Sequence, residues 1–232
     1  MALAARGLRL IVPDQRGHGA SQGTHHQLTI GLLAADLRAL IVHLGLTGFS
    51  LVGWSMGAMV AWEYLRQFGR IGLDKLSIVD MTPKIVSDDD WAHGLTGGYP
   101  AAMVQQTAQS VRTNWQRVSM LGAGRLFARN ATPDPALLQQ FAGIMRANHP
   151  DGLANLWIDM ARQDYRRLLP TLGMDCQFIH GMESRLYRPE TFAHLAQMTA
   201  TTQLTGLADA GHVLQWEQPD AFGKALLHHL QH

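Results

Sequence analysis

The pentapeptide Gly-Trp-Ser-Met-Gly at residues 53–57 constrains the fold of this chain more than any other feature. An apolar run, 49–52, leads into it, and a helical pattern over 58–68 follows it. A strand, a sharp turn and a helix are the parts of a nucleophile elbow, in which the turn strains the backbone of a serine. Glycines two residues before and two after Ser55 remove Cβ atoms that would collide with the neighbouring strand and helix. The sequence therefore predicts a strand, a nucleophile and a helix centred on Ser55.

Length, composition and charge exclude several classes of protein. A chain of 232 residues that is 47% apolar favours one α/β domain with an insertion over two small domains. A net charge of +1 without runs of like charge argues against a nucleic-acid partner. The single Cys176 excludes an internal disulfide framework, and Arg6 and Arg9 interrupt any signal-peptide pattern, so we expect a cytoplasmic protein. The longest apolar stretch, 49–62, is too short to span a membrane.

Strand patterns alternate with helical patterns along the chain, as in a parallel sheet wrapped by helices. The strands are expected at 8–13, 49–52, 76–79, 176–180 and 202–207, and the main helices at 28–44, 58–68 and 221–230. Between the third and fourth strands the sequence is helical or loop-like, at 89–99, 101–115, 135–148 and 153–168. We therefore expect a core made of 1–82 and 172–232, with a helical cap insertion at 83–171.

Three further segments complete a family pattern. Residues 14–21, Asp-Gln-Arg-Gly-His-Gly-Ala-Ser, look like a loop that follows a strand, and Ala-Gly-His at 210–212 precedes Glu-Gln-Pro at 217–219. Together with the elbow and the inserted helices, these segments occur in the order and spacing of the α/β-hydrolase family, which the chain resembles over essentially its whole length. The resemblance implies a mostly parallel sheet with flanking helices and a helical cap.

The reaction implied by the elbow needs a base that accepts the proton of Ser55 near neutral pH. His212 is the best candidate among 12 histidines, because it follows a glycine in the loop that the resemblance makes catalytic. The sequence has no HExxH motif and no histidine-rich cluster with a carboxylate, so we expect no metal. No phosphate loop or dinucleotide fingerprint is present, so no cofactor is expected either.

The third triad member departs from the commonest pattern. Many α/β-hydrolases carry an Asp three residues after the glycine that ends the seventh strand, and Ser184 stands there. A neutral hydroxyl cannot stabilise an imidazolium as a carboxylate does. Asp80 ends the strand 76–79, as in a minority branch of the family, and Glu183 is one residue from the usual place. Asp80 is favoured because the end of its strand lies at the same rim as the elbow, although Asp80 also suits a role in capping the turn 81–83.

A second departure lies at the start of the chain. In the family, two strands and a loop that supplies one oxyanion-hole amide precede the strand matched by 8–13, where this chain has seven residues. Met56 supplies one backbone amide, and the second donor is missing together with the strand between 8–13 and 49–52. Either the chain is a truncated version of a longer hydrolase or its sheet is rearranged. We expect an unfilled gap, or a direct pairing of the two strands, with the Met56 amide as the only preformed donor.

The substrate class follows from the nucleophile. A serine at the elbow indicates acyl transfer to water, hence hydrolysis of a small ester, thioester or lactone. Trp54 and Met56 flank Ser55 and are expected to touch an apolar substrate. Large apolar residues of the insertion could line an acyl pocket or pack the insertion onto the sheet: Trp91, Met103, Trp115, Met120, Phe127, Phe141, Met145, Trp157 and Met160. Two alternatives stay open, a hydrolase-fold binding protein with little turnover and another triad reaction such as carbon–carbon bond hydrolysis or perhydrolysis.

Overall fold

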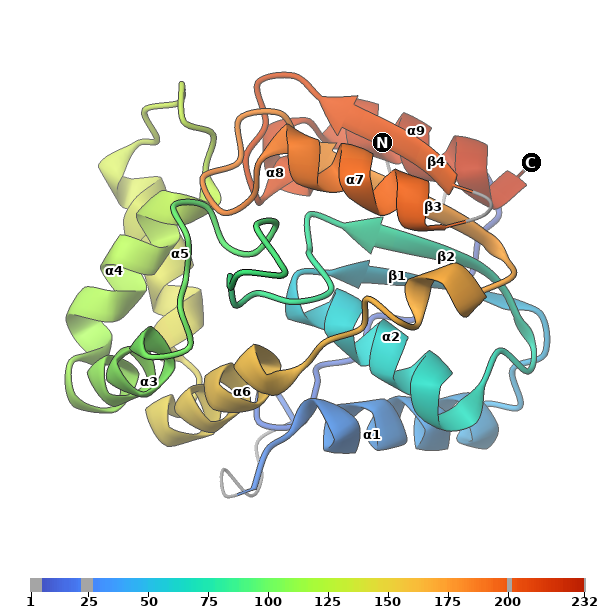
Figure 1. The fold of residues 1–232 in the computed structure, drawn as a ribbon, viewed down its shortest axis with the longest axis horizontal. Coiled ribbons are helices and arrows are strands. Elements are labelled where there is room, and N and C mark those ends of the chain that lie inside the picture. The colour runs from blue at the N-terminus through green and yellow to red at the C-terminus, as the bar shows by residue number, and fades with distance from the viewer. Residues whose placement is uncertain (1–5, 22–26, 200–201, 232) are drawn as a thin grey trace.

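Parallel strands form the centre of the molecule. The computed structural model describes residues 6–21, 27–199 and 202–231. Within them, the sheet has the order β1-β2-β3-β4, and every neighbouring pair is parallel (Figure 1). The strands are β1 Phe49–Trp54, β2 Leu73–Val79, β3 Asp175–Gly181 and β4 Thr202–Leu207. The predicted α/β class and the strands at 49–52, 76–79, 176–180 and 202–207 are confirmed.

Alternating side chains give the sheet two buried faces. Leu76 and Ile78 of β2 belong to the large apolar core with α1 (Ile30–His43), α2 (Met56–Phe68) and α7 (Pro189–Met198). Val79 and Ile179 point to the other face and pack with α8 (Leu214–Glu217) and α9 (Pro219–Gln231). Period 2 along these strands therefore explains why both faces are apolar, as expected for a parallel sheet covered by helices. No helix among the described residues is long and apolar enough to cross a membrane.

The inserted segment is helical in the structure. It contains α3 (Met103–Thr113), α4 (Trp115–Leu126), α5 (Pro135–Arg146) and α6 (Pro150–Arg162), which gather at one end of the sheet (Figure 1). A short 3-10 helix, η2 (Leu169–Thr171), leads back to β3. The expected helices near 101–115, 135–148 and 153–168 are present, whereas 89–99 is loop. Aromatic cap residues pack against each other: the rings of Phe127 and Phe141 lie 5.1 Å apart in an edge contact.

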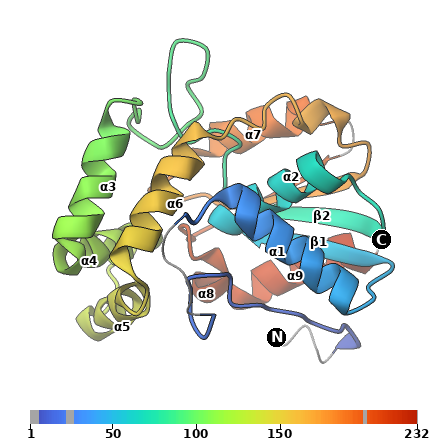
Figure 2. The same cartoon turned by 90° about the horizontal axis from the view of Figure 1, so that it is seen from below.

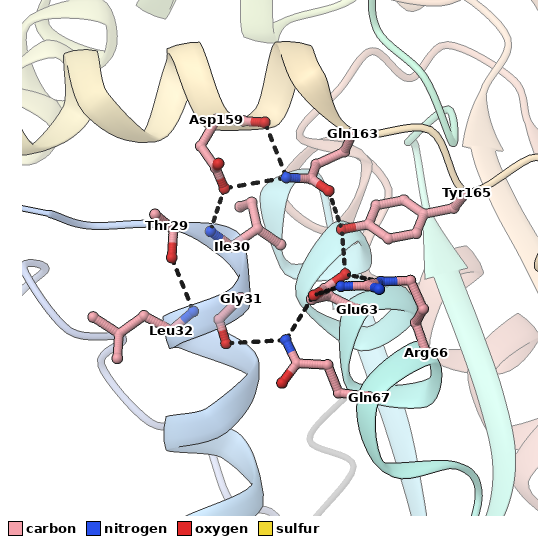
Figure 3. Close-up of polar contacts among 10 residues, drawn as sticks. All are labelled: Thr29, Ile30, Gly31, Leu32, Glu63, Arg66, Gln67, Asp159, Gln163 and Tyr165. Atoms are coloured by element: carbon pink, nitrogen blue, oxygen red, sulfur yellow. Dashed lines mark hydrogen bonds and ion pairs between the residues drawn. The ribbon is translucent and has the colours of Figure 1, made fainter.

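Polar contacts tie α6 to the core. Asp159 of α6 accepts a 2.7 Å hydrogen bond from the backbone N of Ile30, where α1 begins, and Gln163 donates to the same carboxylate. The Tyr165 hydroxyl lies 3.1 Å from Glu63 Oε2 on α2, the helix that follows the elbow. Figure 3 shows this network running from α6 through Tyr165 to α1 and α2. The network therefore fixes one side of the cap to the helix that carries the elbow.

Glu63 is the charged centre of this network. Its side chain is buried and accepts two hydrogen bonds from Arg66, at 2.6 and 2.8 Å, and one from Gln67 at 2.6 Å. Burial opposes ionisation, but the hydrogen bonds from Arg66, Gln67 and Tyr165 outweigh it and hold the pKa of Glu63 below its ordinary value. Glu63 is therefore a carboxylate at neutral pH.

The segment 8–13 is not a strand, contrary to the sequence prediction. It is extended but pairs with no strand among the described residues, and Val12 is 89% exposed. Figure 2 shows it in dark blue, apart from β1 and β2. A groove of about 1350 Å³ lies between it and β1, lined also by Leu37 and Leu40 of α1. Because this groove separates the segment from β1, the two form no ladder, so β1 is an edge strand of the described sheet and the expected gap is unfilled.

Candidate active site

The elbow has the strained geometry that the sequence predicts. Ser55 lies between β1 and α2 with φ 53° and ψ −125°, and its backbone N donates to Val79 O at 3.0 Å. This conformation is rare for a residue with a side chain and is tolerated where the surrounding structure enforces it. A Cβ on Gly53 would stand 2.6 Å from Ala58 Cα, so only glycine fits there.

Gly57 differs from Gly53. A Cβ on Gly57 would meet nothing closer than Gln15 Nε2 at 3.8 Å, an ordinary contact. The expected collision on this side is therefore absent. Gly57 and Gln15 both line the groove beside β1, so the space next to Gly57 is open and no strand of the described sheet packs against the turn there.

Asp80 and His212 form a buried pair. Asp80 follows β2 with φ +45°, a strained conformation, and is fully buried. His212 follows β4 in a loop held by a 2.7 Å hydrogen bond from its backbone N to Leu126 O at the end of α4. The two side chains meet at 2.7 Å between His212 Nδ1 and Asp80 Oδ2. Donation of Nδ1–H to the carboxylate leaves Nε2 as the proton-accepting nitrogen.

Two further groups hold the Asp80 carboxylate. The backbone N of Gly181, at the end of β3, donates to Oδ1 at 3.2 Å. The Ser184 hydroxyl donates to Oδ2 at 2.9 Å, and Ser184 is buried. The sequence marks Ser184 as a departure from the family pattern but does not reveal its contact with Asp80.

Glu183, the alternative acid, lies elsewhere. Its carboxylate is 3.1 Å from Arg129 Nη2 and its side chain is 33% exposed. Its backbone N donates to Ala210 O, which holds the chain at this point and leaves the side chain directed to Arg129. The geometry thus joins Asp80, and not Glu183, to His212.

Trp54 and Met56 flank the nucleophile as expected. The Trp54 indole N–H donates to the backbone O of His212 at 2.7 Å, and the Trp54 and His212 rings lie 5.2 Å apart. Trp54 is 38% exposed, so one part of its ring stays accessible. This hydrogen bond therefore joins the histidine loop to Trp54, the residue before Ser55. The sequence did not reveal this contact. Met56 begins α2, where backbone amides lack intrahelical acceptors and are available to an anion.

The site is built where strands end. Ser55 follows β1, Asp80 follows β2 and His212 follows β4, so the carboxyl ends of parallel strands collect these residues at one rim. Among the described residues, no group of three or more His, Cys, Asp or Glu side chains is placed to hold a metal ion. Within the part of the chain that the structure describes, no hydrogen bond joins the Ser55 side chain to His212, and the elbow and the histidine loop meet through the hydrogen bond of Trp54. A strained serine and a buried histidine–carboxylate pair at one rim are the parts that an acyl-transfer reaction requires.

Comparison with known proteins shows the family of this chain. The model of the Alpha/beta hydrolase family matches residues 1–225. The chain superposes on an esterase from Exiguobacterium antarcticum with a TM-score of 0.85 at 21% identity, covering 94% of this chain and 80% of that one. For a thermophilic esterase from Thermogutta terrifontis the TM-score is 0.81 at 27% identity, and the match covers 94% of this chain and 78% of that one. 3-Oxoadipate enol-lactonase 2 from Acinetobacter baylyi is 24% identical over 219 residues, 94% of this chain and 76% of that protein.

Proposed function

We propose, from the premise that this chain belongs to the α/β-hydrolase family, that it is a serine hydrolase of small carboxylic esters, thioesters or lactones. The observation that carries the proposal is the buried 2.7 Å contact between His212 and Asp80, held against the strained elbow by Trp54. A thermophilic esterase and an enol-lactonase are among the chain's relatives, and their names support the ester and lactone class.

The proposed reaction has two acyl-transfer steps. His212 Nε2 accepts the proton of Ser55 while Oγ attacks the acyl carbon, and Asp80 stabilises the imidazolium that forms. The Met56 amide donates to the oxyanion of the tetrahedral intermediate. Collapse breaks the bond to the alcohol or thiol, which leaves with the proton from His212. Water, activated by His212, then attacks the acyl-Ser55 ester and releases the acid and the free serine.

The substrate is proposed to be a small apolar molecule that binds at the rim of the sheet that carries the elbow. The cap at 83–171 stands over the rim where the strands end, and the exposed part of Trp54 offers an apolar surface beside Ser55. Neither metal nor cofactor is needed, because serine, histidine and carboxylate supply the nucleophile, the base and its counter-charge. We further propose that the protein is located in the cytoplasm.

A second candidate, a binding protein with little turnover, is favoured by the groove beside β1. That groove is lined by Trp54 and Gly57 of the elbow, and the Met56 amide is the one oxyanion donor that the proposed reaction uses. Loss of one oxyanion donor costs roughly 100- to 1,000-fold in rate. The two candidates predict the same site but different turnover.

Hydrolysis of p-nitrophenyl butyrate tests the proposal. Ser55→Ala should lower kcat by about a thousandfold or more, because the residual rate comes only from the remaining site. Ser110→Ala, which removes a cap serine bonded to Gln106 O, is the matched control and should leave kcat unchanged. Ester binding without measurable turnover in the unaltered protein would support the binding protein. Turnover that survives Ser55→Ala would exclude both.

A further inference from the structure

We propose that Ser184 is a positioning residue that fixes the Asp80 carboxylate in the orientation that His212 requires. Ser184 touches Asp80 and acts on the reaction only through it. The inference rests on the proposed function, since Asp80 matters to catalysis only if His212 is the base.

The hydrogen bonds around Ser184 determine the direction of its hydroxyl. Its Oγ accepts from the backbone N–H groups of Leu186 at 3.3 Å and Tyr187 at 3.4 Å. Those two donors use the lone pairs of the oxygen, so the hydroxyl proton is left to be donated. Asp80 Oδ2, at 2.9 Å, is the acceptor. Ser184 is only 1% exposed, so water does not compete for this proton.

The same carboxylate oxygen also meets the base. Asp80 Oδ2 accepts from both Ser184 Oγ and His212 Nδ1, whereas Oδ1 accepts from Gly181 N. Without the Ser184 donor, the carboxylate is held by one backbone amide and by the histidine that it has to orient. A carboxylate that can rotate loses the alignment with Nδ1 on which the tautomer of His212 depends.

The backbone places Ser184 for this contact. Its backbone N donates to Gly181 O at 3.2 Å, which closes a turn at the end of β3. The turn places the Ser184 hydroxyl within hydrogen-bonding distance of Asp80, which has a strained φ of +45° at the end of β2. At the position where the family commonly carries its acid, this chain therefore has Ser184, which donates a hydrogen bond to the acid at the end of the neighbouring strand. A carboxylate at both positions would place like charges in a buried space.

Ser184→Ala tests the inference with two readouts. We expect kcat for p-nitrophenyl butyrate to fall by about tenfold with KM unchanged, as for loss of one hydrogen bond to a charged group. We also expect the NMR signal of the His212 Nδ1 proton, which is hydrogen-bonded to Oδ2, to broaden or move upfield, because a carboxylate that can rotate no longer holds that hydrogen bond in one geometry. Ser184→Thr keeps the hydroxyl and should restore both quantities.

Ser77→Ala is the matched control. Ser77 is also fully buried and its hydroxyl bonds to Gln177 Oε1 at 3.3 Å, on the strand that leads to Asp80. Ser77→Ala should lower the melting temperature without changing the Nδ1 proton signal of His212. If Ser184→Ala is too unstable to measure, Ser184→Cys preserves the volume with a weak donor and should give changes in the same direction.

The Nδ1 proton signal of His212 separates this proposal from the proposed function. The signal is assigned by its loss in His212→Gln, and it is a property of the resting protein that needs no turnover. A broadened or upfield-shifted Nδ1 proton signal in Ser184→Ala supports the positioning role, whether or not an ester is hydrolysed. An unchanged signal and unchanged kcat, or equal changes in Ser77→Ala, would overturn it. Absence of ester turnover in the unaltered protein would instead remove the proposed function.

Discussion

Replacing Asp80 with Asn is the change whose effect the structure specifies most fully. Asn is nearly isosteric with Asp, and residue 80 is fully buried, so the side chain has two orientations available. Gly181 N can only donate, at 3.2 Å, so the amide oxygen must take the place of Oδ1. The amide nitrogen then faces His212 Nδ1, which must accept a hydrogen bond where it now donates. It also faces the Ser184 hydroxyl, which rotates to accept and gives up one of its long bonds from Leu186 and Tyr187. The proton of the neutral imidazole moves to Nε2.

A histidine with its proton on Nε2 cannot accept the proton of Ser55. The same isosteric change in a Ser-His-Asp triad costs about 10⁴ in kcat. At 1.36 kcal/mol for each factor of ten, this corresponds to about 5.4 kcal/mol of lost transition-state stabilisation. The opposite orientation of the introduced amide, with its NH2 group against the N–H of Gly181, would preserve the histidine tautomer but would bury two opposed donors, which costs about 1–3 kcal/mol.

The assay is steady-state hydrolysis of p-nitrophenyl butyrate, with thermal unfolding to confirm that the variant is folded. Glu183→Gln is the control, because Glu183 forms only a partly exposed pair with Arg129, and such pairs contribute about 0–1 kcal/mol. Its kcat should stay within about twofold of the starting value. A folded Asp80→Asn variant that retains a tenth of the activity, or an equal loss in Glu183→Gln, would refute the assignment of the acid.

Two other predictions concern the packing of the elbow and the charge of Glu63. Gly53→Ala should destabilise or prevent folding, because its Cβ meets backbone at 2.6 Å, whereas Gly57→Ala should melt close to the parent; equal melting temperatures would contradict the packing. Glu63→Gln should destabilise the protein at neutral pH by roughly 2 kcal/mol. Because the folded pKa of Glu63 is lowered, that difference should shrink as pH falls through it, and a difference constant with pH in denaturant titrations would contradict this.

Local sequence patterns predicted most of the central sheet. Apolar runs such as 76–79 and 176–180 were recognisable because buried parallel strands need apolar residues on both faces. The segment 8–13 has the same pattern and is not a strand. A strand exists only with a partner for its backbone, and the groove separates this segment from β1. Composition cannot report whether that partner is present.

The site was predictable in its elements but not in its contacts. Ser55 and His212 stand in motifs that are local in sequence. The pairing of Asp80 with Ser184 joins residues 104 positions apart, and the Trp54 contact with His212 joins residues 158 apart. Such contacts depend on how strand ends meet at the rim of the sheet, which no single segment encodes. The strained φ of Asp80 likewise becomes visible only in three dimensions.

Covalent labelling tests the central claim, that Ser55 is an activated nucleophile, most directly. The folded protein is incubated with a fluorophosphonate probe, digested and analysed by mass spectrometry. We expect one adduct on the peptide that contains Ser55, no adduct in Ser55→Ala, and much slower labelling in His212→Gln because the base is missing. An adduct on another serine, or no adduct on the folded protein, would contradict the account.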